Sequence, residues 1–160
     1  MDVIALVGPS GTGKSHRALI VAHKYDADVI IDDGILIKGG KILAGHSAKH
    51  EKSRIMAVRR AIFILPGHAA EVKEALDKVA PRRVLIIGTS ENMAYKIAKI
   101  LGLPPVARII RIKDIETRAE MDNLIRDTLW EELPECYDDA SVASYGQKVY
   151  AYVYTRYKVA

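Results

Sequence analysis

A phosphate-binding motif lies near the start of the chain. Residues Gly8 to Ser15 match the pattern G-x-x-x-x-G-K-[ST], the P-loop. Glycines let such a loop curl until several N–H groups point at phosphate oxygens, and the next helix adds its dipole. Lys14 would reach the β- and γ-phosphates of a nucleotide, and the Ser15 hydroxyl would hold Mg²⁺. The nucleotide-binding residues predicted here are Gly8, Pro9, Ser10, Gly11, Thr12, Gly13, Lys14, Ser15 and His16.

The residues on both sides of the motif fit a P-loop. The apolar run from Val3 to Val7 is suited to a buried parallel strand. Ala18, Leu19, Val21 and Ala22 follow at helical spacing. The sequence therefore predicts a strand, a glycine-rich loop and a helix in the order that phosphate binding requires.

Two carboxylates follow the next apolar run. Val29 to Ile31 predicts a strand, with Asp32 and Asp33 at its carboxyl end, which is the ligand edge of an open parallel sheet. Oxygen donors suit Mg²⁺, and a carboxylate can instead accept a proton from an attacking hydroxyl or water. We predict Lys14, Asp32 and Asp33 as catalytic residues, and Ser15 and Asp32 as metal ligands. The alternative for the two aspartates is a polar strand end before a glycine turn.

A basic stretch could bind a second substrate. Residues 46–60 hold two His, two Lys and three Arg against one Glu. They could bind a small anionic acceptor or a nucleic-acid phosphate, or simply form a solvated face. The candidate acceptor-binding residues are Lys49 and Arg54, with Gly88 and Thr89 after the apolar run 84–87. Thr89 and Ser90 could equally cap the following helix.

The remaining pattern predicts an α/β chain. Residues 35–43 indicate a hairpin around a Gly-Gly turn, and residues 107–112 a further strand. Helices are expected over 53–65, 68–80, 91–101 and 114–132, and a period-2 strand with three tyrosines over 148–157. This order predicts one nucleotide-binding domain over residues 1–160, with three layers and a mostly parallel central sheet. The last strand, expected at an edge, could form a homo-oligomer contact.

With these residues in place, the chain resembles the P-loop NTPases. Its layout is similar to that of small metabolite and nucleotide kinases such as shikimate kinase, with an acidic strand end after the first helix and arginines on the helices beyond. That resemblance implies an acceptor held by the arginines and the Gly88-Thr89-Ser90 turn. Gly88 stands where a Walker B strand ends in an acidic residue. The chain also resembles uncharacterised P-loop proteins of Gram-positive bacteria with Asp-Asp-Gly, Ser-Ala-Lys and Gly-Thr-Ser segments, here beginning at Asp32, Ser47 and Gly88.

Composition sets the limits of the functional hypothesis. The chain has 160 residues, a net charge of +4 and one cysteine, and no apolar run approaches the ~18 residues that span a membrane. A cytoplasmic location, without a signal peptide, is the simplest interpretation.

We expect an Mg-ATP-dependent, kinase-like phosphotransferase with a small anionic acceptor. The alternatives are a nucleotide-dependent regulatory NTPase and, less favoured, a nucleic-acid-binding ATPase. ATP is the default nucleotide because no Asn-Lys-x-Asp motif is present.

Overall fold

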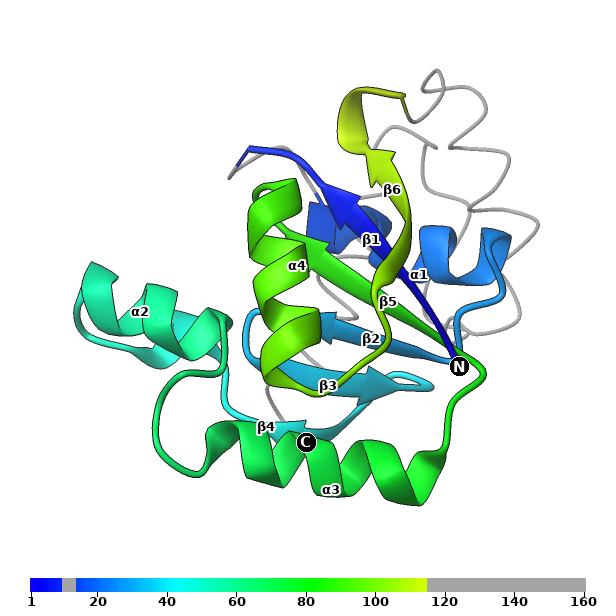
Figure 1. Ribbon diagram of the computed structural model, residues 1–160. Helices are drawn as coiled ribbons and strands as arrows, with labels where there is room; N and C mark the ends of the chain where they lie inside the picture. Colours follow the sequence, from blue (N-terminus) through cyan, green and yellow to red (C-terminus); the bar gives the residue numbers. More distant parts are fainter. Residues whose placement is uncertain (10–13, 115–160) are drawn as a thin grey trace, which may run out of the picture.

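The computed structural model describes residues 1–9 and 14–114, and their side chains apart from those of Ser15 and His16 (Figure 1). The strands are β1 (Asp2–Val7), β2 (Val29–Asp32), β3 (Ile35–Lys38), β4 (Lys41–Gly45), β5 (Arg83–Gly88) and β6 (Val106–Arg111). The α-helices are α1 (Lys14–Lys24), α2 (Arg54–Ala61), α3 (His68–Val79) and α4 (Glu91–Ile100). Two 3₁₀ turns, η1 (Ala48–His50) and η2 (Ile112–Asp114), complete the described elements.

The described strands form one mixed sheet in the order β4-β3-β2-β5-β1-β6. Strands β2, β5, β1 and β6 run parallel, and β3 and β4 add an antiparallel hairpin at one edge. The predicted α/β class and the mostly parallel sheet are confirmed. Val7 pairs with Gly88, so β1 and β5 end side by side.

Helices cover both faces of the sheet, which gives three layers (Figure 1). Strand side chains alternate between the faces, so β1 sends Ile4 and Leu6 toward α1 and Val3, Ala5 and Val7 toward α3 and α4. Each fully buried aliphatic side chain contributes about 1.5–3 kcal/mol. The α1 side includes Ala18, Val21, Ala22, Ile30, Leu85 and Ile87, and the opposite side includes Val29, Ile31, Val72, Leu76, Val84, Ile86, Ala94 and Ile97.

The helix predicted over 53–65 is shorter than expected. It ends at Ala61 because Phe63 adopts the left-handed region, with φ +64°. The Phe63 N–H then donates to the Arg60 carbonyl, and the Ile64 N–H to the Arg59 carbonyl, the bonds of a Schellman end. Glycine usually takes this position, but here the backbone turns the Phe63 ring into the core, where it is 1% exposed.

The turn after β2 also differs from the sequence interpretation. Asp33 and Gly34 have φ values of +54° and +87°, and Asp32 pairs with Ile35 across them. This is a two-residue hairpin with the positive φ values of a type I′ turn. The predicted hairpin between β3 and β4 is confirmed, but β3 also continues the main sheet beside β2.

Several sequence predictions lie outside the described residues. They are the loop residues 10–13, the helix beyond Asp114 and the strand over 148–157 with its possible oligomer contact. Within residues 1–9 and 14–114, no helix is both long enough and apolar enough to cross a membrane.

Candidate functional site

The carboxyl ends of β1 and β5 form a switch point in the sheet. From β1 the chain passes to α1 on one face, and from β5 it passes to α4 on the other. In open α/β sheets, ligands bind in the crevice where neighbouring strands diverge in this way. The P-loop sequence begins at this point on β1, and the Gly88-Thr89-Ser90 turn leaves it on β5.

Gly8 and Gly88 connect the two strands at this switch point. The Gly8 N–H donates to the Gly88 carbonyl at 3.2 Å, which fixes the start of the P-loop sequence to β5. A Cβ placed on Gly88 would have the Ser90 carbonyl oxygen as its nearest neighbour, at 3.4 Å. The backbone therefore admits a Cβ at Gly88, the position where a Walker B strand would end in an acidic residue.

Lys14 begins α1 at the same edge. Its Nζ donates to the Pro9 carbonyl oxygen at 2.8 Å, so the ammonium group closes back over the start of the loop. Burial lowers the pKa of Lys14, and the negative charge of Asp32 partly opposes that shift. Lys14 and Asp32, both predicted as site residues, are therefore electrostatic neighbours.

Asp32 is the last residue of β2 and lies on the same face as Ile30, which packs on the α1 side. Its carboxylate is the kind of oxygen donor that Mg²⁺ prefers, and Mg²⁺ commonly takes one or two carboxylates together with waters and phosphates. Asp32 therefore fits the predicted metal role. The Ser15 side chain, the other predicted ligand, lies outside the described part.

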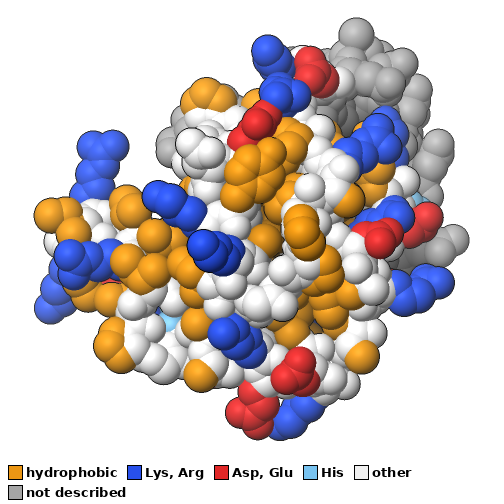
Figure 2. All heavy atoms as spheres, in the orientation of Figure 1, with side chains coloured by type: hydrophobic (Ala, Val, Ile, Leu, Met, Phe, Trp, Pro, Cys, Tyr) orange, Lys and Arg blue, Asp and Glu red, His pale blue; other side chains and the backbone are white. Residues whose placement is uncertain are grey.

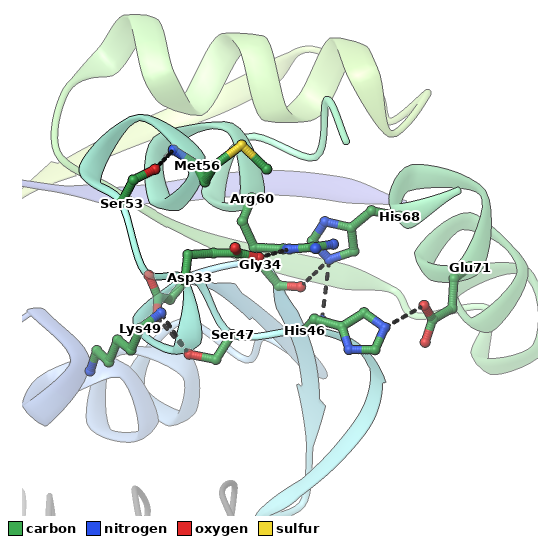
Figure 3. A network of polar contacts seen from close by, with 11 residues as sticks. Asp33, Gly34, His46, Ser47, Lys49, Ser53, Met56, Arg60, His68 and Glu71 are labelled. Atoms are coloured by element: carbon green, nitrogen blue, oxygen red, sulfur yellow. Dashed lines mark hydrogen bonds and ion pairs between the residues drawn. The ribbon is translucent and has the colours of Figure 1, made fainter. Parts of the chain in front are cut away.

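Asp33 is held by the segment after β4 (Figure 3). Its Oδ2 accepts the Ser47 hydroxyl at 2.9 Å, and its carbonyl oxygen accepts the Ala48 N–H at 2.9 Å. Burial raises the pKa of the Asp33 carboxyl, while the Ser47 hydrogen bond and the charge of Lys49 act in the opposite direction. The two aspartates thus have different surroundings. The charge of Asp32 acts on the Lys14 ammonium group, whereas Asp33 forms hydrogen bonds that anchor residues 47 and 48.

A buried histidine supports the same turn from α3 (Figure 3). His68 is 2% exposed, and its Nε2–H donates to the Gly34 carbonyl oxygen at 2.6 Å. That tautomer leaves Nδ1 without a proton, and within the described residues Nδ1 has no hydrogen-bond partner. Burial accordingly lowers the pKa of His68. Its ring packs against Phe63, with 4.6 Å between ring centroids.

Glu71 and Glu51 complete the network around this turn. Glu71 accepts the Gly45 N–H at 3.1 Å and lies 3.4 Å from the His46 ring nitrogen. Glu51 pairs with Arg60 at 2.9 Å. The described part of the chain holds no group of three His, Cys, Asp or Glu residues suited to a metal.

The predicted acceptor-binding residues fall into two groups. Gly88 and Thr89 lie beside β1, and the Thr89 N–H and hydroxyl both donate to the Met93 sulfur at 3.3 Å. Lys49 lies in η1 and Arg54 begins α2, and both are exposed. Helix α2, which begins at Arg54, stands off the body in Figure 1, and Figure 2 shows basic and apolar side chains together on it. The sequence predicted all four residues as parts of one acceptor site and did not distinguish the two groups.

Ser47 and His68 were missed from the sequence, and the turn at Asp33 was given only as an alternative to a functional role. The structural role of Asp33 was available from Asp-Gly between two apolar runs, which is a strong hairpin signal. Ser47 and His68 carried no local signal. Their contacts with Asp33 and Gly34 cross 14 and 34 positions of the chain.

Comparisons with known proteins found no match to this chain among family models, curated proteins or solved structures.

Proposed function

We propose that the chain is a P-loop NTPase-like protein that binds a nucleoside triphosphate, with ATP and Mg²⁺ as the expected pair, and transfers the γ-phosphoryl group. The observation that carries this proposal is the position of Gly8 to Ser15. The motif joins an interior parallel strand to the amino end of α1 at the switch point of the sheet. Phosphate-binding backbone amides and a helix dipole are most useful at that position.

The neighbouring charges support the same proposal. Lys14 supplies a cation at the start of α1, and Asp32 supplies a nearby anion that could share a metal with the phosphates. When bound, Mg²⁺ would neutralise charge on the β- and γ-phosphates, with Ser15 and Asp32 as the residues that would hold it. In the nucleotide-bound protein, Lys14 would exchange its bond to the Pro9 carbonyl for a phosphate oxygen.

Catalysis in this proposal depends on position and charge. Phosphoryl transfer asks the protein mainly to align the attacking oxygen and stabilise the spreading negative charge. Lys14 and the loop amides would provide the charge, and a carboxylate at the end of β2 would take the proton of the attacking group. The exposed residues Lys49 and Arg54 remain the candidates for holding an anionic acceptor.

An acceptor screen tests the transferase part of the proposal. Small hydroxylated and phosphorylated compounds are added with Mg-ATP, and ADP release is measured. We expect at least one acceptor to raise turnover many-fold and Arg54→Ala to raise its KM. Equal ADP release with and without every acceptor would contradict transfer to a small molecule.

A regulatory NTPase is the second candidate, favoured by one observation. Residues 46–51 are attached to the Asp33-Gly34 turn, which directly follows Asp32. A nucleotide that moved Asp32 could therefore change how that segment is held. Limited proteolysis with ADP and with a non-hydrolysable ATP analogue tests this: a switch predicts different cleavage rates over residues 45–52, and identical rates would contradict it.

A further inference from the structure

Ser47 differs from the other serines that cap helices in the described chain. The hydroxyls of Ser47, Ser53 and Ser90 each accept a backbone N–H, from Lys49, Met56 and Met93, at 3.1–3.2 Å. The Ser47 hydroxyl also donates to a carboxylate, the Oδ2 of Asp33, at 2.9 Å. A cap needs the accepted N–H bond only, so the bond to Asp33 is additional to the capping role.

The Ser47–Asp33 pair has the geometry of an activated hydroxyl. A carboxylate within hydrogen-bond distance can accept the proton of a hydroxyl as its oxygen attacks phosphorus. Asp33 is partly buried, and its Oδ2 lies 2.9 Å from the Ser47 hydroxyl oxygen, which is the contact that a general base requires. Ser53 and Ser90 have the same capping role, and within the described residues neither donates to a carboxylate.

The pair lies at the edge of the sheet that carries the P-loop sequence. Asp33 follows β2, which is separated from β1 only by β5. Neighbouring strands lie about 4.8 Å apart, so the ends of β1 and β2 are separated by about 10 Å. A nucleotide whose phosphates lie at the P-loop would therefore place its terminal phosphate at the same edge as Ser47.

We propose that Ser47 is a phosphoryl acceptor, so that the chain phosphorylates itself at this residue. The inference rests on the proposed function, because it requires a nucleoside triphosphate at the P-loop. A bond forms between Ser47 Oγ and the γ-phosphorus, the bond from the γ-phosphorus to the bridging oxygen of the β-phosphate breaks, and the hydroxyl proton passes to Asp33 Oδ2. The products are phosphoserine at position 47 and the nucleoside diphosphate.

The surroundings of Ser47 fit both the reaction and its consequence. The positive charge of Lys49 acts on Asp33, so it would also stabilise a phosphate beside it. The modified side chain, however, would have no proton to donate to Asp33 and would repel its carboxylate. Phosphorylation would therefore break the hydrogen bond that joins Ser47 to the Asp33-Gly34 turn.

The chain offers an unambiguous readout. Trypsin cleavage after Lys41 and Lys49 releases residues 42–49, whose single hydroxyl side chain is Ser47. The full-length protein is incubated with Mg²⁺ and γ-labelled ATP, and nucleotide binding is measured on the same sample by calorimetry. We expect acid-stable phosphate on this peptide. If the labelling rate constant depends on protein concentration, the phosphoryl group is transferred between two copies of the chain. If it does not, the transfer takes place within one copy.

Matched variants identify the residues responsible. Ser47→Ala and Asp33→Asn should each reduce the label on the peptide at least about tenfold, and Ser53→Ala, which removes a comparable cap, should leave it unchanged. Ser47→Thr keeps a hydroxyl and should retain label, which provides a test if Ser47→Ala does not fold. A wild-type protein that binds ATP but leaves the peptide unmodified would overturn this inference and leave the nucleotide site standing. Acid-labile phosphate on His46, or full labelling of Asp33→Asn, would overturn it as well. A protein that does not bind ATP would instead overturn the proposed function.

Discussion

Three glycine-to-alanine substitutions separate backbone strain from steric crowding around the candidate site. Gly34 has φ +87°, and an added Cβ would lie 2.4 Å from the His46 carbonyl oxygen and 3.1 Å from the His68 ring. Gly67 has φ +78° but open space around the Cβ position. At Gly88 the nearest atom to a Cβ is at 3.4 Å, and the residue is in a strand. An alanine at Gly34 would therefore meet both backbone strain and steric crowding. At Gly67 it would meet backbone strain alone, and at Gly88 it would meet neither.

The expected magnitudes follow from these differences. A non-glycine residue in the left-handed region costs about 1–2 kcal/mol, which we expect for Gly67→Ala. Gly34→Ala must in addition displace the backbone of residue 46, so we expect a loss of about 3 kcal/mol or more in the free energy of unfolding. For a chain of this size, that corresponds to about 6–12 °C in Tm. Gly88→Ala should change stability by less than about 1 kcal/mol in either direction.

Urea unfolding followed by far-ultraviolet circular dichroism measures all three variants. The order of destabilisation should be Gly34→Ala, then Gly67→Ala, then Gly88→Ala, with similar m-values. If Gly34→Ala and Gly67→Ala lost the same free energy of unfolding, the reasoning would be refuted. The close approach of residue 46 to the Asp33-Gly34 turn would then add nothing to the cost of the substitution.

Two pH-dependent predictions concern the same turn. The raised pKa of Asp33 means that the folded protein holds this proton more tightly than the unfolded chain, so the contribution of Asp33 to stability falls as pH rises above its ordinary value near 3.8. Asp33→Asn should remove that slope and be at least as stable as wild type at neutral pH; a clear loss of stability at neutral pH would contradict the account. His68 has a lowered pKa, so its contribution is complete above about 6.5 and is lost as pH falls below that value. His68→Leu should flatten the fall in unfolding free energy between about pH 6.5 and pH 5, and an unchanged slope would mean that another group causes it.

Much of the fold follows from local sequence patterns. The apolar runs of β1, β2 and β5 and the periodicity of α3 and α4 predicted elements that the structure contains, because each pattern reports burial on a sheet or a helix face. The serine cap of α4 was also predictable from its position before Glu91. The end of α2 was not, since Phe63 takes a position where glycine is the usual signal.

The site was less accessible to sequence reasoning. The motif from Gly8 to Ser15 is read from contiguous residues, and the position of Asp32 was predicted from its place at the carboxyl end of a strand. The Asp33–Ser47 and Gly34–His68 contacts depend instead on two hairpins and a helix start that bring distant residues together. A charged residue after a strand can serve a turn or a reaction, and only the position of its partner distinguishes these roles.

The measurement that tests the central claim most directly is calorimetric titration of Mg-ATP into wild type and Lys14→Ala. Loss of one charged contact to phosphate costs about 1.5–3 kcal/mol, so we expect affinity to fall by about 10- to 100-fold or more. The melting temperature should stay close to that of wild type, since the Lys14 ammonium bonds to the exposed Pro9 carbonyl rather than to the core. Lys24→Ala, at the opposite end of α1, is the matched control and should bind Mg-ATP as wild type does. Equal affinity in Lys14→Ala and wild type, or no binding by either, would contradict the assignment of this loop as a nucleotide site.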